Sequence, residues 1–233
     1  IGLGNLALIC LAAVLAAYPF TSQTGSLFLA LSAMKQSLVF PLYFQLLFKR
    51  PKVLILPFVV FALCGLATLW WTRLSITESL GILKAWVANV SSWTTADHTC
   101  LRRPLSLFIK TPPVLSVVVW VTWFALFGVT ARWIKDPLAQ LAALLLLCLL
   151  PMYHNAYDMV AAVPALAIFM KRCPLVWPAL MTLALALDPF RQISMLVPAG
   201  PLRELCLALQ SSYLPVLILA FIGGLLYLEV GAS

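Results

Sequence analysis

The chain has 233 residues, of which 64% are hydrophobic and only 9% are charged, and its net charge is +8. A soluble domain usually carries about 25% charged residues, and a fold of this size has too little interior to keep so much apolar side chain from water. The composition therefore excludes a soluble globular protein and indicates one that lipid solvates. In lipid the backbone has to satisfy its own hydrogen bonds, which leaves helices or a closed barrel, and the unbroken apolar runs favour helices.

The basic residues lie mostly between the apolar runs. The chain carries 15 Lys and Arg residues against 7 Asp and Glu residues. In a soluble protein such an excess can indicate nucleic-acid binding, but the sequence shows no basic stripe with interleaved aromatic residues on a polar face. We interpret the charges as loop anchors at an anionic membrane surface, so the expected partner is the lipid bilayer and not nucleic acid.

A membrane span requires about 20 apolar residues, and eight apolar runs follow one another along this chain. They cover residues 3–18, 26–48, 53–71, 113–131, 137–151, 155–170, 175–187 and 213–230. The sequence therefore predicts an all-α, polytopic transmembrane helix bundle of about seven or eight spans, forming a single transmembrane domain over 1–233. Prolines inside the runs predict kinked helices; they are Pro41, Pro57, Pro164, Pro178 and Pro215.

Other prolines mark the beginnings of helices. Pro112, Pro137 and Pro174 stand at the starts of runs, where a missing backbone N–H costs nothing. Asp136 directly precedes Pro137, and an aspartate in this place is typical of a helix N-cap.

Three short basic clusters set the expected orientation. They lie at 49–52, 132–135 and 171–172, and successive clusters are separated by two predicted spans. All three therefore fall on one face of the membrane, which the positive-inside rule assigns to the cytoplasm. We expect an integral protein of the plasma (inner) membrane, with 72–111 and 188–210 on the outer face.

The outer segment 72–111 contains an amphipathic pattern. Apolar residues recur in steps of four and three from Ile76 to Val90, as on one face of an α-helix, and Ser75 with Glu78 fits a capping box. We predict a helix over 75–90. It lies either on the outer membrane surface, as an interfacial helix, or packed against the protein itself.

Ionisable groups within a membrane are costly, so each is a functional candidate. Lys35 and Gln36 lie inside the second run, and Lys35 is roughly 20 Å along a helix from Lys49. His154 and Asp158 are four positions apart, with Asn155 between them, at the outer junction of the fifth and sixth runs. These groups are expected at one outer depth. They either bind a lipid-linked phosphate sugar, or Asp158 only pairs with Lys35 to stabilise packing.

The remaining candidates carry weaker signals. Arg102 and Arg103, in the outer segment, suit either a substrate phosphate or anionic lipid headgroups. Cys100 and Cys206 are both expected outside, where a disulfide is one hypothesis. The sequence shows no metal-ligand spacing, phosphate-binding loop or nucleotide fingerprint, so we expect no metal and no cofactor.

Two segments resemble a known family. Residues 32–41, "SAMKQSLVFP", followed by an apolar stretch and "FKRPK" at 48–52, form one of them. Residues 149–158, "LLPMYHNAYD", followed by "VPAL" at 163–166, form the other. Both are similar to the C-terminal part of the polyprenol-phosphate-mannose-dependent mannosyltransferases, multi-span membrane glycosyltransferases of the GT-C class. The resemblance covers roughly residues 25–170, and its motifs are short and degenerate.

The resemblance implies a glycosyltransferase that moves a sugar from a polyprenyl-phosphate donor to an outer-face acceptor. It implies donor contacts by Lys35 and His154, and a second run made of two half-helices meeting at Lys35. The family's catalytic carboxylate is expected on the first outer loop, so we expect an N-terminal portion to precede this sequence. Within this sequence Asp158 is the first candidate for the base, and Asp97 is the other.

The alternative is a non-catalytic scaffold subunit of a larger membrane complex with protein partners, a degenerate relative of such enzymes. Few carboxylates lie on the predicted outer face, which favours this alternative. A transporter ranks third among the hypotheses. Transporters often carry an internal repeat, and this sequence shows no convincing one.

Overall fold

The computed structural model describes residues 3–17, 23–32, 36–92, 101–151, 156–187, 193 and 195–231. These residues form helices and turns, without a strand among them. The chain divides into two compact units, Ile1–Ala96 and Asp97–Ser233, each of which is described by itself. The expectation of a single transmembrane domain stays a prediction.

Among the described residues, three helical segments are long and apolar enough to cross a bilayer. They are Pro51–Thr72, Pro112–Trp133 and Pro201–Val230, and the first two, at 22 residues each, reach about 33 Å. The chain is therefore an all-α membrane protein, as the composition predicted. Four further apolar helices have 10 to 17 residues, shorter than a full span, so the expected number of seven or eight spans stays a prediction.

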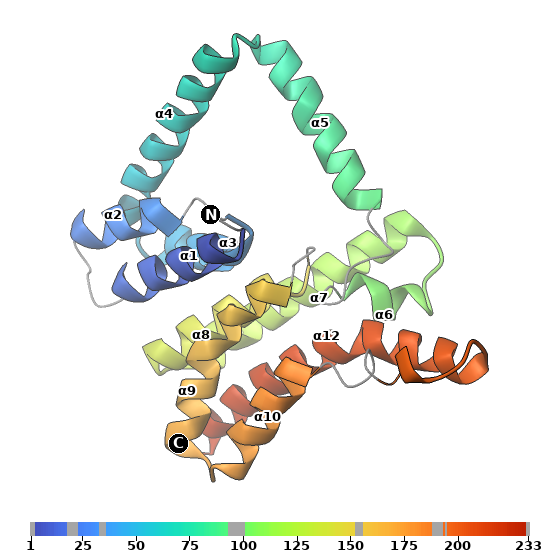
Figure 1. The fold of residues 1–233 in the computed structure, drawn as a ribbon. Coiled ribbons are helices and arrows are strands. Elements are labelled where there is room, and N and C mark those ends of the chain that lie inside the picture. Colours follow the sequence, from blue (N-terminus) through green and yellow to red (C-terminus); the bar gives the residue numbers. More distant parts are fainter. Residues whose placement is uncertain are drawn as a thin grey trace. The chain divides into compact units, whose positions relative to one another are not determined.

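The described part of the first unit forms five α-helices and one 3-10 helix. They are α1 (Leu3–Ala17), α2 (Gln23–Ser32), α3 (Gln36–Lys49), η2 (Pro51–Leu54), α4 (Ile55–Thr72) and α5 (Ile76–Ser92). Helix α2 packs against α1 and α4 (Figure 1), around buried apolar side chains that include Val14, Leu29 and Leu54. The second apolar run is divided between α2 and α3, with 33–35 outside the described residues.

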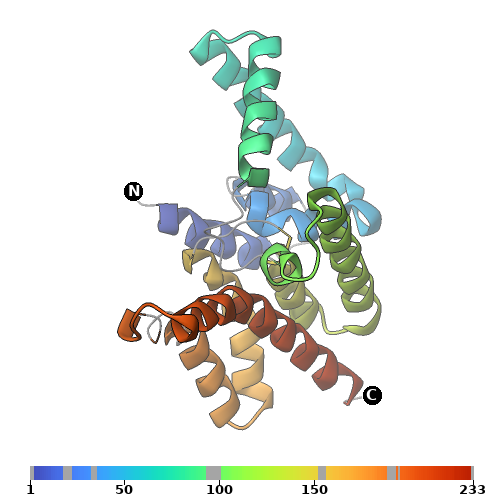
Figure 2. The same cartoon turned by 90° about the vertical axis from the view of Figure 1, so that its right-hand side faces the viewer.

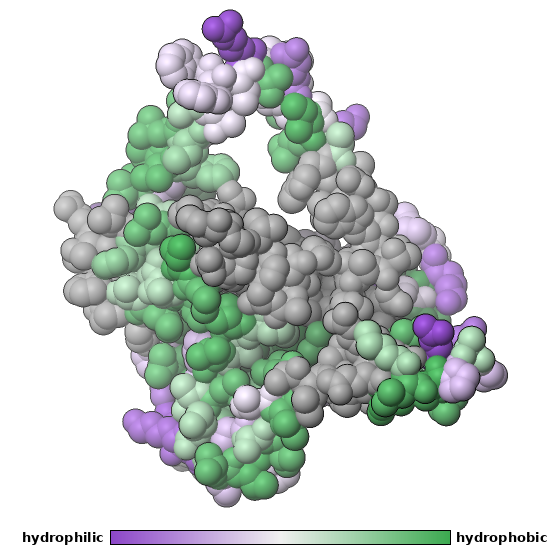
Figure 3. All heavy atoms as spheres, viewed as in Figure 1, coloured by the Kyte–Doolittle hydropathy of each residue, from purple (hydrophilic) through white to green (hydrophobic). Residues whose placement is uncertain are grey.

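Helices α4 and α5 diverge from a short turn (Figure 1). Arg73 ends α4 in the left-handed conformation, with φ of 55°. The capping box is confirmed, because the Ser75 N–H donates to Glu78 Oε2 at 2.7 Å and the Glu78 N–H donates to Ser75 Oγ at 3.2 Å. In Figure 3 hydrophilic residues gather at this tip, while the surface of α4 beside it is hydrophobic. The interfacial location of α5 stays a prediction.

The second unit is arranged around α8. Its helices are α6 (Arg102–Ser106), α7 (Pro112–Trp133), α8 (Pro137–Cys148), η3 (Ala156–Ala162), α9 (Val163–Arg172), α10 (Val176–Leu187) and α12 (Pro201–Val230). Residues 141–150 are all buried, because α7, α9, α12 and η3 all contact α8. The indole N–H of Trp123 on α7 donates to the carbonyl oxygen of Leu147 at 3.0 Å. Figure 2 shows α9 and α10 side by side, as a helical hairpin.

The prolines divide into two groups. Pro41 and Pro215 lie inside α3 and α12, as predicted. The prediction for Pro57, Pro164 and Pro178 was wrong, because each lies within the first three residues of its helix. The first residues of a helix have no intrahelical acceptor for their N–H groups, so a proline there does not kink the helix.

Candidate functional site

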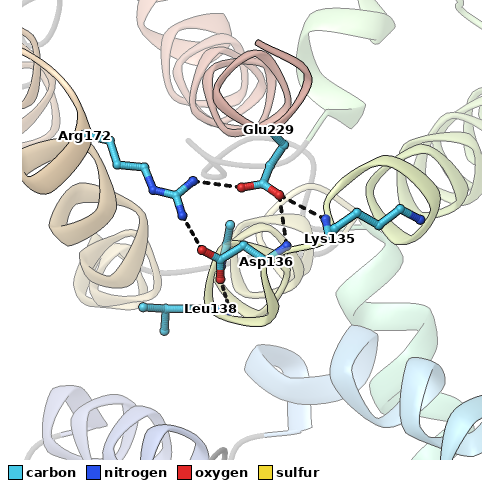
Figure 4. Close-up of polar contacts among 6 residues, drawn as sticks. Lys135, Asp136, Leu138, Arg172 and Glu229 are labelled. Atoms are coloured by element: carbon cyan, nitrogen blue, oxygen red, sulfur yellow. Dashed lines mark hydrogen bonds and ion pairs between the residues drawn. The ribbon is translucent and has the colours of Figure 1, made fainter. Parts of the chain in front are cut away.

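Three charged side chains form an ion cluster at one end of the second unit: Asp136, Arg172 and Glu229 (Figure 4). Glu229 lies in the last turn of α12, and its Oε1 accepts a hydrogen bond from Arg172 Nη1 at 2.8 Å. Its Oε2 accepts from the backbone N–H groups of Lys135, at 3.1 Å, and Asp136, at 2.9 Å. A single carboxylate thus joins the end of α12 to the end of α9 and to the start of α8.

Asp136 has two functions in the ion cluster. Its Oδ1 accepts from the N–H groups of Leu138, at 2.8 Å, and Ala139, at 3.3 Å, which confirms it as the N-cap of α8. Its Oδ2 pairs with Arg172 Nη2. Pro137 occupies the first helical position and has no N–H to satisfy. The Asp136 carboxylate is therefore available to the next two N–H groups, those of Leu138 and Ala139.

The ion cluster is partly protected from solvent. The Glu229 side chain is 10% exposed and that of Arg172 36%. The hydrogen bond to Glu229 raises the pKa of the Arg172 guanidinium above its ordinary value, and the charge of Asp136 adds to the effect. Arg172 thus faces two carboxylates, those of Asp136 and Glu229.

The ion cluster brings residues 134–136 and Arg172 to one end of the unit. The predicted topology requires this, since the basic clusters 132–135 and 171–172 are expected on one face. The assignment of that face to the cytoplasm stays a prediction. Sequence reasoning missed Glu229, although a lone acid at the end of the last apolar run, level with two basic clusters, is a signal that could have indicated it.

The opposite end of α8 lies beside α6. The N–H of Leu101 donates to the carbonyl oxygen of Leu150 at 2.8 Å, and both side chains are buried. Arg102 follows at the start of α6, half-buried and with its Nε atom buried. The start of α6 is therefore held beside Leu150, which precedes His154 by four positions in the sequence.

The other predicted site residues are described only in part. Lys35, His154 and Asn155 lie outside the described residues. The structure places Gln36 at the start of α3, Arg103 in α6 and Asp158 in η3, by their backbones alone. Arg103 and Asp158 belong to the second unit, and Lys35 and Gln36 to the first. The convergence of Lys35 with His154 and Asp158 therefore stays a prediction.

The cysteines and potential metal ligands carry no further site. Within the described ranges, no group of three or more His, Cys, Asp or Glu side chains is placed to hold a metal ion. Cys206 is a buried free thiol, and Cys100 lies outside the described residues. Because Cys100 is not described, the hypothesis of a disulfide between the two stays a prediction.

Comparisons with protein-family models, with curated proteins and with solved structures find no match to this chain. What can be argued about its function therefore rests on its residues and their geometry.

Proposed function

We propose that this chain is part of a membrane glycosyltransferase of the GT-C class, which transfers a sugar from a polyprenyl-phosphate donor to an outer-face acceptor. The observation that carries the proposal is the hydrogen bond between Leu101 and Leu150. It holds Leu101, which directly precedes the α6 arginines, beside Leu150, and the segment with His154, Asn155 and Asp158 follows Leu150 in the sequence. Cations beside an imidazole and a carboxylate are the groups that transfer from a sugar phosphate requires.

The proposed reaction assigns one step to each group. The acceptor hydroxyl attacks the anomeric carbon of the sugar, and the bond from that carbon to the phosphate oxygen breaks. The proton of the hydroxyl goes to Asp158, and the electron pair leaves with the polyprenyl phosphate. Arg102 and Arg103 stabilise the negative charge that develops on this phosphate, together with His154.

Donor binding tests the proposal without knowledge of the acceptor. Polyprenyl-phosphate mannose is the probe that the family resemblance suggests, and native mass spectrometry of the detergent-solubilised protein measures its binding. Arg102→Gln should weaken binding about ten- to a hundredfold, because a charge-assisted hydrogen bond contributes roughly 1.5–3 kcal/mol. Arg102→Lys keeps the charge and should restore part of the affinity.

Arg50→Gln is the matched control, because Arg50 is an exposed cation that belongs to neither proposed phosphate site. It should leave the affinity for the donor unchanged. Equal loss of affinity in the Arg102 and Arg50 variants would show that the donor binds through general electrostatics. Absence of donor binding by the unmodified protein would contradict the enzyme and favour the non-catalytic scaffold subunit.

A further inference from the structure

Three hydrogen-bond donors converge on the Glu229 carboxylate. The N–H groups of Lys135 and Asp136 donate to one oxygen, at 3.1 and 2.9 Å, and the Arg172 guanidinium donates to the other at 2.8 Å. Figure 4 shows these donors on two sides of the carboxylate. Adjacent backbone N–H groups at a helix start, with an arginine beside them, are also the groups that bind phosphate in proteins.

The donors are held in place without Glu229. Asp136 is fixed by the two hydrogen bonds with which it caps α8, and these make the backbone of 135–136 part of a rigid helix start. Arg172 keeps its second bond, to the Asp136 carboxylate. The donor geometry therefore does not depend on the carboxylate that occupies it.

The occupant comes from a helix end. Glu229 is the residue before the end of α12 at Val230, and the helix is capped by Gly231. The last turn of a helix has carbonyl groups without intrahelical partners, and helix ends open at lower free energy than helix centres. Glu229 is therefore a ligand that can leave while the donors remain.

Charge favours a second anion in its place. Arg132, Lys135 and Lys171 are exposed, and each lies within three positions of a residue that supplies one of the donors. Asp136 stays in place and repels any anion bound there. The structure already holds the Glu229 carboxylate against this repulsion, since both carboxylates pair with Arg172. Once Glu229 has left, these three cations and Arg172 outnumber the one carboxylate of Asp136 in these segments, at the end of the unit predicted to meet the anionic lipid surface.

We propose that the Lys135 and Asp136 amides and the Arg172 guanidinium form a binding site for a phosphate group, which Glu229 occupies as an internal ligand. The ligand is a negatively charged phosphate, from an anionic lipid headgroup or free in solution, since both present the same oxygen atoms. Its binding releases the end of α12. The proposal does not depend on the glycosyltransferase function, because it concerns the opposite end of α8.

The first experiment removes the internal ligand by the substitution Glu229→Ala. In detergent, inorganic phosphate should raise the unfolding midpoint of the Glu229→Ala variant in a saturable way. The apparent affinity for phosphate should be at least about tenfold higher than in the unmodified protein, because there the tethered Glu229 carboxylate competes at high effective concentration. Glu229→Gln is the matched control: it loses the same charge but keeps an amide in the site, so phosphate should have little effect. In the double variant Glu229→Ala/Arg172→Gln, phosphate should no longer raise the unfolding midpoint; this rise is called the rescue below.

Chloride at equal ionic strength separates a bound phosphate from general screening. If chloride stabilises Glu229→Ala as well as phosphate does, or if the rescue survives the loss of Arg172, the proposal is overturned. Rescue by phosphate alone, dependent on Arg172, supports it.

The second experiment uses the unmodified protein and does not depend on the folding of a variant. Hydrogen exchange of amides 227–231 is measured in phosphatidylcholine nanodiscs with and without phosphatidylglycerol, and separately with inorganic phosphate. Faster exchange with phosphatidylglycerol identifies a lipid headgroup as the source, and faster exchange with phosphate alone identifies the free anion. Unchanged exchange in both conditions overturns the displacement of Glu229.

Discussion

Replacing Asp136 separates the two functions of its carboxylate. In Asp136→Ala both are lost: the cap on the N–H groups of Leu138 and Ala139, and the pair with Arg172. Loss of an N-cap costs about 0.5–2 kcal/mol. The ion pair adds about 0–1 kcal/mol, since the two side chains are 36% and 29% exposed and solvent screens them.

Arg172 is not left without a partner in this variant, because Glu229 still accepts its other N–H group. The larger cost of an isolated buried charge therefore does not arise. We expect Asp136→Ala to lower the free energy of unfolding by about 0.5–3 kcal/mol. Asp136→Asn keeps an oxygen that caps the helix and should cost at most about 1 kcal/mol.

Equilibrium unfolding by sodium dodecyl sulfate in mixed micelles measures both variants against the unmodified protein. The difference between Ala and Asn isolates the cap, and salt should change the Asn variant less than the unmodified protein, because the ion pair is already absent. If Asn destabilises as much as Ala does, the cap contributes nothing and the reasoning is refuted.

Two further predictions concern packing and pH. A Cβ atom at Gly224 would lie 2.8 Å from the ring of Phe169, so Gly224→Ala should lower the free energy of unfolding by about 1–3 kcal/mol. Gly223→Ala is the control and should not lower it, because a Cβ atom there meets nothing within 4 Å. Equal effects of the two substitutions would refute the close contact. Hydrogen bonds from Ser75 hold the pKa of Glu78 below its ordinary value of 4.5. The cap is therefore fully present above pH 4.5 and is lost as the pH falls through the lower pKa of the folded protein. An NMR titration should show the Glu78 midpoint moving up toward 4.5 in Ser75→Ala, and an unchanged midpoint would refute the assignment.

The features that could be predicted from the sequence are those that neighbouring residues determine. The capping box at Ser75 and the N-cap at Asp136 are set within four residues, and both are confirmed. The start of α7 at Pro112 is likewise local, since proline suits the first helical position. Composition alone was sufficient for the all-α membrane class, because lipid leaves the backbone few other solutions.

The ends of the helices could not be read from apolar runs. The run 137–151 continues past the end of α8 at Cys148, because Leu149 and Leu150 are buried in a turn as completely as helical residues are. Conversely, α12 begins at Pro201, twelve positions before the last run. Hydropathy measures which residues avoid water, whereas a helix continues wherever its backbone hydrogen bonds can continue.

The ion cluster lay beyond local reasoning for another reason. Glu229 and Asp136 are about 90 positions apart, and no periodicity connects them. Only the packing of α12 against α8 and α9 brings them together. The same holds at the other end of α8, where Leu101 meets Leu150.

Helix α8 connects these two long-range contacts and makes their effects separable. Its residues from Leu141 to Cys148 are all buried, and close-packed interiors resist small displacements. Its start is fixed by the ion cluster, and the turn after its end by Leu101, about 18 Å away along the helix. Weakening the cap at Asp136 should therefore lower stability while leaving donor affinity at Arg102 unchanged, because α8 is held at its other end. If Asp136→Ala weakens binding of the sugar donor while the protein stays folded, α8 shifts as a rigid body, and the ion cluster is coupled to the candidate site.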